Sequence, residues 1–147
     1  MSRRMLINLI VILAVLGLVD SLYLASHAAS DTALFCDIGA GLDGCNQVAQ
    51  SPYSQIYGIP LAYLGVGFYA LLLVASLVAA GRHSRFVHQA LLVVAGVGAL
   101  FSIVFLYIQL VLIQALCVYC IASAAIAFLS LGAAVYLDRR HAPVVVP

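Results

Sequence analysis

Charged side chains are scarce in this sequence, and lysine is missing altogether. Only 7% of the 147 residues are charged, whereas 66% are hydrophobic and the mean hydropathy is +1.20. Charged residues make up about a quarter of an ordinary soluble domain, so this composition excludes a soluble domain. The sequence shows no repeat or low-complexity segment, and its net charge of +1 gives no indication of nucleic-acid binding. The length allows one domain, which we expect to be an all-α membrane protein.

The few charges are distributed unevenly along the chain. The six arginines form three pairs, each beside an apolar run: Arg3/Arg4, Arg82/Arg85 and Arg139/Arg140. Positive residues collect at the cytoplasmic ends of membrane spans. This pattern predicts that both termini are cytoplasmic and that the number of spans is even.

Four apolar runs are long enough to cross about 30 Å of hydrocarbon. We expect membrane spans at about 5–25, 59–80, 89–114 and 117–137, with an outer loop over 26–58 and a short inner tail after 137. Asp43 is placed to cap a short helix over 45–50 in the loop, and Pro60 to occupy the first turn of the second span. The first run is also compatible with a cleaved signal peptide, but it exceeds the roughly 7–15 residues of a signal core, so we expect a retained helix.

This topology places all four cysteines, Cys36, Cys45, Cys117 and Cys120, on the outer face, which indicates an oxidising compartment. Two structural disulfides, or buried cysteines acting as small hydrophobes, are one interpretation. A zinc site is a second, although zinc sites usually use two short cysteine pairs. The third is a relay, in which one pair passes electrons to the other through mixed disulfides. The Cys-x-x-Cys spacing at the first turn of a helix favours the relay, because the helix N-terminus stabilises a thiolate and so short a loop adds little stability.

Several motifs occur in a fixed order between about Gly17 and Ser123. Ser51 follows Cys45 by six residues, and Gly65 and Ser102 lie in the second and third spans. The remaining motifs are Asp20-Ser21-Leu22-Tyr23, Cys36-Asp37-Ile38-Gly39, Gly58-Ile59-Pro60 and Cys117-Val118-Tyr119-Cys120. With these motifs the chain resembles the vitamin K epoxide reductase family, especially its bacterial members.

The resemblance implies a four-transmembrane-helix bundle around a quinone pocket, capped by the cysteine-containing loop between the first two helices. It implies that Cys120 faces the quinone, that Cys117 exchanges disulfides with Cys45, and that Cys36 reacts with a separate periplasmic thioredoxin-like protein. Ser51 is implied to help the quinone site. The resemblance also implies a quinone of the ubiquinone, menaquinone or vitamin K type as the electron acceptor, and we expect no metal. Integral location in a bacterial inner membrane, with the cysteines on the periplasmic side, is expected.

Two features depart from the vertebrate pattern. The asparagine that bonds a quinone carbonyl near the second span has no counterpart, because Asn46 is the last asparagine in the chain, and Ala124 replaces a tyrosine one turn beyond the cysteine pair. Plain quinone reduction is therefore expected rather than epoxide chemistry. Only ten residues follow the fourth span, so no fused thioredoxin-like domain is expected.

Three further residues are candidates for the quinone site. Asp20 is an ionisable group within a span, and it shares a helical face with Tyr23 and His27 that is suited to deliver protons. A hydrated carboxylate at the membrane interface is the alternative. Gln109 lies near the depth of Cys120 and is placed to donate to a quinone oxygen or to bond a neighbouring helix. Tyr107 is either a pocket wall or an interface-belt residue.

These observations predict a membrane thiol–disulfide oxidoreductase that draws electrons from the thioredoxin-like partner through Cys36/Cys45 to Cys117/Cys120 and on to quinone, supporting disulfide bond formation. A DsbB-type quinone-linked oxidase is an alternative, but it carries Cys-x-x-Cys in the first outer loop. A non-enzymatic membrane adaptor with structural disulfides is the other alternative.

Overall fold

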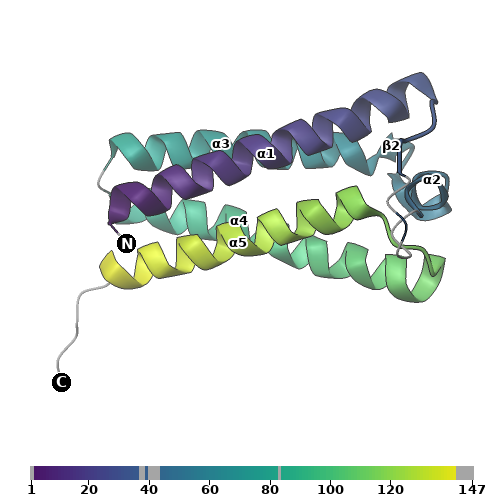
Figure 1. Ribbon diagram of the computed structural model, residues 1–147. Helices are drawn as coiled ribbons and strands as arrows, with labels where there is room; N and C mark the ends of the chain where they lie inside the picture. Colours follow the sequence, from purple (N-terminus) through teal and green to yellow (C-terminus); the bar gives the residue numbers. More distant parts are fainter. Residues whose placement is uncertain (1, 37–38, 40–43, 83, 142–147) are drawn as a thin grey trace.

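Four long helices form an antiparallel bundle in a computed structural model that describes residues 2–36, 39, 44–82 and 84–141 (Figure 1). Within those ranges, four helical segments are long and apolar enough to cross a membrane: Arg3–Ser30, Leu61–Gly81, Arg85–Ile113 and Val118–Arg139. The predicted four-helix membrane fold is confirmed. In chain order the elements are α1 (Arg3–Ser30), α2 (Cys45–Ala49), η1 (Pro52–Ser54), β1 (Gln55–Ile56), β2 (Ile59–Pro60), α3 (Leu61–Gly81), α4 (Arg85–Tyr107), η2 (Ile108–Ile113) and α5 (Val118–His141).

The four long helices close into a ring. Helix α1 packs against α3 and α5, and α4 packs against the same two helices from the other side. The N-terminus, the α3–α4 connection and the end of α5 meet at one end of the bundle, here called the terminal end (Figure 1). Helix α2, the β1–β2 hairpin and the α4–α5 link lie at the other end, here called the loop end.

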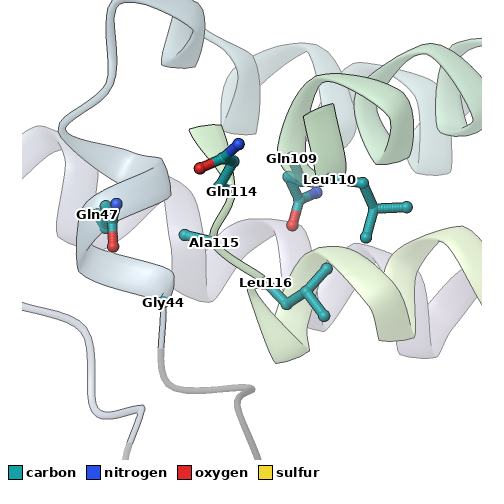
Figure 2. A pocket seen from close by; sticks show the side chains of 7 residues that line it. All are labelled: Gly44, Gln47, Gln109, Leu110, Gln114, Ala115 and Leu116. Carbon is teal, nitrogen blue, oxygen red and sulfur yellow. The ribbon is translucent and has the colours of Figure 1, made fainter. Parts of the chain in front are cut away.

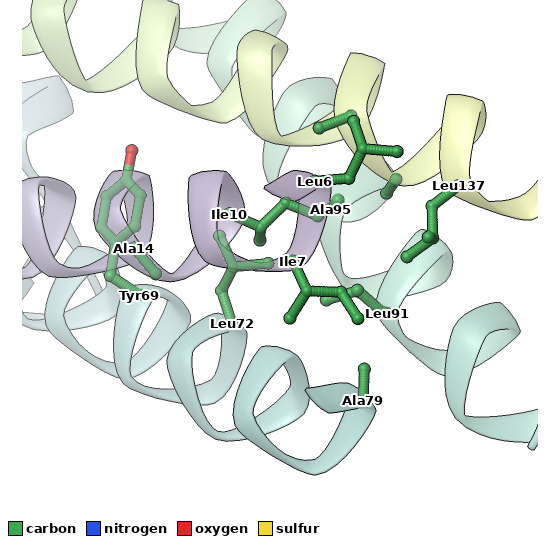
Figure 3. Close-up of a cluster of buried hydrophobic side chains, with 12 residues drawn as sticks. Leu6, Ile7, Ile10, Ala14, Tyr69, Leu72, Ala79, Leu91, Ala95 and Leu137 are labelled. Carbon is green, nitrogen blue, oxygen red and sulfur yellow. The ribbon is translucent and has the colours of Figure 1, made fainter. Parts of the chain in front are cut away.

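A cluster of buried apolar side chains fills the terminal half of the bundle (Figure 3). Its aliphatic side chains interdigitate with alanines, which let neighbouring helices approach closely. A polar contact reinforces this end, because the Arg3 guanidinium donates to the backbone carbonyls of Ala79 and Arg82 and so ties α1 to the end of α3. The cluster consists of Leu6, Ile7, Ile10, Ala14, Tyr69, Leu72, Ala79, Leu91, Ala95, Ala133, Ala134 and Leu137.

Helix α1 is longer than the 5–25 span that hydrophobicity predicted. It has 28 residues, which at 1.5 Å per residue is about 42 Å, more than the hydrocarbon thickness. Its last turns are polar, and the hydroxyls of Ser26 and Ser30 donate to the carbonyls of Tyr23 and Ser26. The outer loop therefore begins after Ser30 rather than at residue 26, and the end of α1 forms a wall beside it.

The second span starts later than predicted because a hairpin precedes it. Strands β1 and β2 pair antiparallel, and the two turn residues, Tyr57 and Gly58, both have positive φ, of 51° and 81°. Positive φ at both central positions matches the right-handed twist of a two-residue hairpin. Pro60 consequently lies in β2 at the N-cap of α3, one residue before the first turn where the sequence had placed it.

The remaining helix bounds differ from the predictions by a few residues. Helix α2 ends at Ala49 and its N-cap is Gly44, without a side-chain bond, whereas the predicted cap, Asp43, lies outside the described residues. Helix α4 starts at Arg85 instead of residue 89, and α5 continues to His141 instead of residue 137. The predictions stopped where the apolar runs stop, but polar residues extend helices beyond the hydrocarbon. Of the predicted tail, residues 142–147 lie outside the described residues.

Candidate functional site

All four cysteines lie at the loop end. Cys36 and Cys45 form a disulfide with a Cα–Cα distance of 6.0 Å, whereas Cys117 and Cys120 are free thiols. Cys45 is 0% exposed and Cys117 is 1% exposed, and with Leu34 they form one buried cluster. Cys36 and Cys120 pack against this cluster and are partly exposed. The loop disulfide and the helical thiol pair therefore share a single packed core.

The two free thiols interact at the start of α5. The backbone N–H of Cys120 donates to the Cys117 sulfur at 3.4 Å. Cys117 immediately precedes the membrane-spanning part of α5. A hydrogen bond from the Cys120 thiol lowers the pKa of Cys117, and backbone N–H groups at Cys120 and Tyr119 lower it further; burial and the Asp20 carboxylate oppose them. The balance lowers the pKa, which favours the thiolate form that reacts with disulfides.

Hydrogen bonds hold the chain segment that leads to Cys36. The N–H of Leu34 donates to Asn46 Oδ1 at 2.7 Å, and Asn46 Nδ2 donates back to the Leu34 carbonyl at 3.0 Å. The N–H of Phe35 donates to the Tyr23 hydroxyl at 3.3 Å, and the Tyr119 hydroxyl donates to the Phe35 carbonyl at 2.7 Å. We call Asn46, Tyr23 and Tyr119 the Leu34–Phe35 clamp. The clamp gives a hydrogen bond to the N–H and the carbonyl of both Leu34 and Phe35, and so it fixes the position of the backbone that leads to Cys36.

Asp20, Tyr23 and His27, which were predicted to share one face of α1, have different surroundings in the structure. The Tyr23 ring packs against both His27 and Tyr119, with centroid distances of 4.5 and 5.1 Å. His27 Nδ1 and the Thr32 hydroxyl are 2.9 Å apart. Tyr23 and His27 thus hold the start of the loop, and Asp20 lies one turn deeper toward the membrane.

A backbone contact joins the loop to the link before Cys117. The N–H of Gly44 donates to the Leu116 carbonyl at 3.0 Å. A methyl group on Gly44 would lie 2.8 Å from the Ala115 Cβ and 3.0 Å from the Leu116 nitrogen and carbonyl oxygen. Only a glycine fits so close to the neighbouring backbone, so Gly44 allows Cys45 to reach Cys117.

Gln109 caps the start of the cysteine motif. It lies in η2, a π-helical segment, and its buried side chain accepts the Cys117 N–H at Oε1, at 3.0 Å. Its backbone carbonyl accepts from Gln114 and Ala115, where the chain turns through a left-handed residue at Gln114. Of the two tasks considered for this side chain, the structure shows a bond to a neighbouring segment, the residue before α5, while donation by its amide nitrogen to a quinone oxygen stays a prediction.

Two cavities open beside the bundle. One, of about 430 Å³, lies between α2 and the α4–α5 link, and three glutamine amides face it (Figure 2); its lining residues are Gly44, Gln47, Gln109, Leu110, Gln114, Ala115 and Leu116. The other, of about 370 Å³, is an apolar groove between α1 and α5 toward the terminal end, lined by Leu6, Leu9, Leu13, Phe128, Leu129, Gly132, Ala133 and Tyr136. A cysteine lines neither of these two cavities.

The other predicted quinone-site residues occupy different surroundings. The Ser51 hydroxyl donates to the Val48 carbonyl at the end of α2. Tyr107 is 58% exposed near the end of α4. Asp20 is partly buried, and its Oδ2 atom is buried with no hydrogen-bond partner. The roles of Ser51, Tyr107 and Asp20 toward a quinone stay predictions.

The helices and cysteines define an integral membrane protein with a disulfide and a dithiol packed together at one end of its bundle. The profile of the family described as "Vitamin K epoxide reductase family" matches residues 8–135, most of the sequence. The chain belongs to this family, so it is a membrane protein of disulfide-linked redox chemistry and an oxidoreductase by family. Members of the family are in general linked to quinones and act with thioredoxin-like partners. A search of the curated proteins finds no match.

Proposed function

We propose that this protein oxidises the thiols of a separate thioredoxin-like protein and passes the electrons to a membrane quinone. The observation that carries this proposal is the shared buried cluster of Cys45 and Cys117. Disulfide exchange requires one sulfur to attack another directly, so the two cysteine pairs must touch at one sulfur each. Cys45 and Cys117 are the pair suited to that contact, while Cys36 and Cys120 keep partial exposure for the outer partner and the quinone.

The transfer between the pairs balances in two exchange steps. The Cys45 thiolate of a reduced loop attacks Cys117 in a Cys117–Cys120 disulfide, and Cys120 leaves as a thiolate. The Cys36 thiolate then attacks Cys45, which restores the loop disulfide and releases Cys117 as a thiolate. Two electrons have moved to the helical pair. A Cys36–Cys45 disulfide together with free Cys117 and Cys120 thiols, the arrangement described above, is the product of these two steps.

The quinone is the substrate that accepts these electrons beside Cys120. When the helical pair closes again to a disulfide, two electrons and two protons pass to the quinone. Cys120 stands one turn into the span and is partly exposed, so a lipid-soluble molecule can approach it within the membrane. Asp20 belongs to this site in the proposal, and Gln109 supports it by holding the Cys117 N–H. Ser51 is assigned to the same site from the family resemblance, and Tyr107 is assigned to it as a wall of the quinone pocket.

Single cysteine variants of the purified protein test the proposal. With a dithiol reductant and a short-tailed quinone, wild-type protein should consume quinone, and Cys117→Ala or Cys120→Ala should reduce turnover to background. Cys36→Ala should retain quinone reduction by a small dithiol that reaches the helical pair, but lose reduction driven by a thioredoxin-like protein. Full activity of both helical variants would show that the cysteines serve only as structural staples.

The location proposed for this chemistry follows the arginine pattern. The described arginines flank the terminal end, so that end is assigned to the cytoplasm and the cysteines to the periplasmic side of a bacterial inner membrane. A membrane-impermeant thiol reagent applied to intact cells should label Cys36 after mild reduction of the Cys36–Cys45 disulfide. Labelling only after the cells are broken would place the loop end on the inner side.

A further inference from the structure

Tyr69 reaches across the core of the bundle to α5, just below the cysteine pair. Its side chain is 2% exposed, and its hydroxyl donates to the Ser123 carbonyl at 2.7 Å and lies 2.9 Å from the Ser123 hydroxyl. Figure 3 shows the ring passing α1 with its hydroxyl directed toward α5. Ser123 follows Cys120 by three residues, so it lies one helical turn, about 4.5 Å, deeper on the same face of α5.

Helix α1 is shaped to admit this ring. A methyl group on Gly17 would lie 2.2 Å from the Tyr69 ring, so the aromatic ring lies directly against the α1 backbone. Asp20 follows Gly17 by three residues and therefore stands one turn nearer the loop end on the same face. Asp20 on α1 therefore lies one turn toward the loop end from the Tyr69 ring, just as Cys120 on α5 lies one turn toward the loop end from Ser123, which the Tyr69 hydroxyl contacts.

One oxygen of the Asp20 carboxylate lacks a hydrogen bond. Its Oδ2 atom is buried without a hydrogen-bond partner, and an unsatisfied buried oxygen of this kind costs free energy. A partly buried carboxylate with one unsatisfied oxygen is suited to accept and release a proton. The Tyr69 ring lies against α1 at Gly17, one turn from Asp20, and its hydroxyl contacts Ser123, so these two hydroxyls can carry a proton from α1 toward α5.

We propose that Asp20, Tyr69 and Ser123 form an intramembrane proton path between the Cys117/Cys120 thiols and the quinone. This proposal rests on the proposed function. Oxidation of the two thiols to a disulfide releases two protons and two electrons, and a quinone takes up the same number to become a quinol. The path therefore needs no outside oxidant or reductant. Asp20 accepts a proton released by the thiols, and the Tyr69 and Ser123 hydroxyls deliver protons to a quinone oxygen held beside Cys120.

The test separates the two halves of the reaction in the full-length protein. Quinone reduction is followed with dithiothreitol and a short-tailed quinone, and reduction of the Cys36–Cys45 disulfide by a reduced thioredoxin-like protein is followed without quinone. Asp20→Asn and Tyr69→Phe should each lower the kcat of quinone reduction by about 10²-fold, the usual contribution of general acid–base catalysis, with KM little changed. The rate of disulfide exchange should stay at the wild-type value. Asp20→Glu should restore most of the kcat.

The matched control is Asp31→Asn, which removes a carboxylate at the exposed C-terminal cap of α1 and should leave both rates unchanged. Wild-type rates of quinone reduction in Asp20→Asn and Tyr69→Phe would overturn the proton path and leave the relay intact. Equal losses in both half-reactions would also overturn it, since they would indicate a structural role. A wild-type protein that reduces no quinone would instead contradict the proposed function itself.

Discussion

The two ends of the bundle are held together by different interactions. At the terminal end, the core is mainly a cluster of aliphatic and alanine side chains from all four long helices, with Ser76, His88 and Ser130 as buried polar residues and Arg3 bonded to the end of α3. At the loop end, the buried cluster is small, and the loop is held by the Leu34–Phe35 clamp, the Gly44–Leu116 bond and the Cys36–Cys45 disulfide. Apolar packing suits a fixed frame, whereas hydrogen bonds and sulfur bonds can be exchanged. We therefore expect the terminal end to provide most of the stability, while the proposed chemistry takes place at the loop end.

The largest expected effect on stability comes from truncating the terminal core. Leu72 is fully buried in that cluster, so Leu72→Ala should lower the free energy of unfolding by about 2–5 kcal/mol through lost contacts and a cavity. The adjacent Leu71 is exposed toward lipid and provides the matched control, because lipid can fill the space that Leu71→Ala leaves. Unfolding of both variants in detergent gives the comparison. Equal effects would show that the core does not carry the stability.

A methyl group at Gly44 should mainly slow disulfide exchange at the loop end, in contrast to the loss of stability expected for Leu72→Ala. Gly44→Ala places that group against Ala115 and the Leu116 backbone, which should weaken loop docking by about 1–3 kcal/mol. Since 1.36 kcal/mol is a tenfold change, exchange from the loop pair to the helical pair should slow by about 5- to 150-fold. Gly67→Ala, at a glycine with open space around it, is the control. Exchange at the wild-type rate in Gly44→Ala would show that close docking is unnecessary.

Asn46 tests the clamp more finely. Asn46→Asp keeps the acceptor for the Leu34 N–H but loses the donor to the Leu34 carbonyl, and Asn46→Ala loses both. Each lost bond should weaken the clamp by about 1 kcal/mol. Hydrogen exchange at the Leu34 amide should therefore accelerate strongly in Asn46→Ala and less in Asn46→Asp. Unchanged exchange in Asn46→Ala would mean that the remaining clamp residues suffice.

The smallest predicted effect is a shift in the pH dependence of Cys117. Because hydrogen bonds lower its pKa from the ordinary value of 9.0, the thiolate should form, and thiol modification should reach half its maximum rate, below pH 9. In Cys120→Ala the strongest of those hydrogen bonds is lost, so the midpoint should move upward. Mass spectrometry of Cys117 after brief treatment with a small methanethiosulfonate provides the measurement. A midpoint at or above pH 9 in the wild type would contradict the expected hydrogen bonding.

The sequence predicted the frame of the molecule well and the loop end only in part. Long apolar runs indicate membrane spans, so the four helices were predictable. Their ends were not, because polar residues such as Ser26 and Ser30 continue a helix by bonding to its own carbonyls. The hairpin at Tyr57 and Gly58 was missed because two-residue strands give almost no periodic signal.

Residues whose partners are backbone atoms or distant side chains left little trace in the sequence. Asn46 bonds the backbone of Leu34, and Gly44 matters because of the neighbouring Leu116, so neither contact follows from a side-chain pattern. Gln109 stood out as a polar residue in an apolar span, but only the π-helical turn shows that it accepts the Cys117 N–H. Tyr69 is likewise a residue with a polar group within an apolar span, but the sequence interpretation did not use it.

The contact between the two cysteine pairs can be measured directly in a variant that keeps only Cys45 and Cys117. The double variant Cys36→Ala/Cys120→Ala, embedded in membranes and treated with a mild oxidant, should form an intramolecular Cys45–Cys117 disulfide in most molecules, seen as a linked peptide by mass spectrometry. The variant Cys36→Ala/Cys117→Ala, which keeps Cys45 and Cys120, should link far less. A folded protein in which Cys45 and Cys117 stay as separate thiols would contradict electron transfer between the loop and the helix.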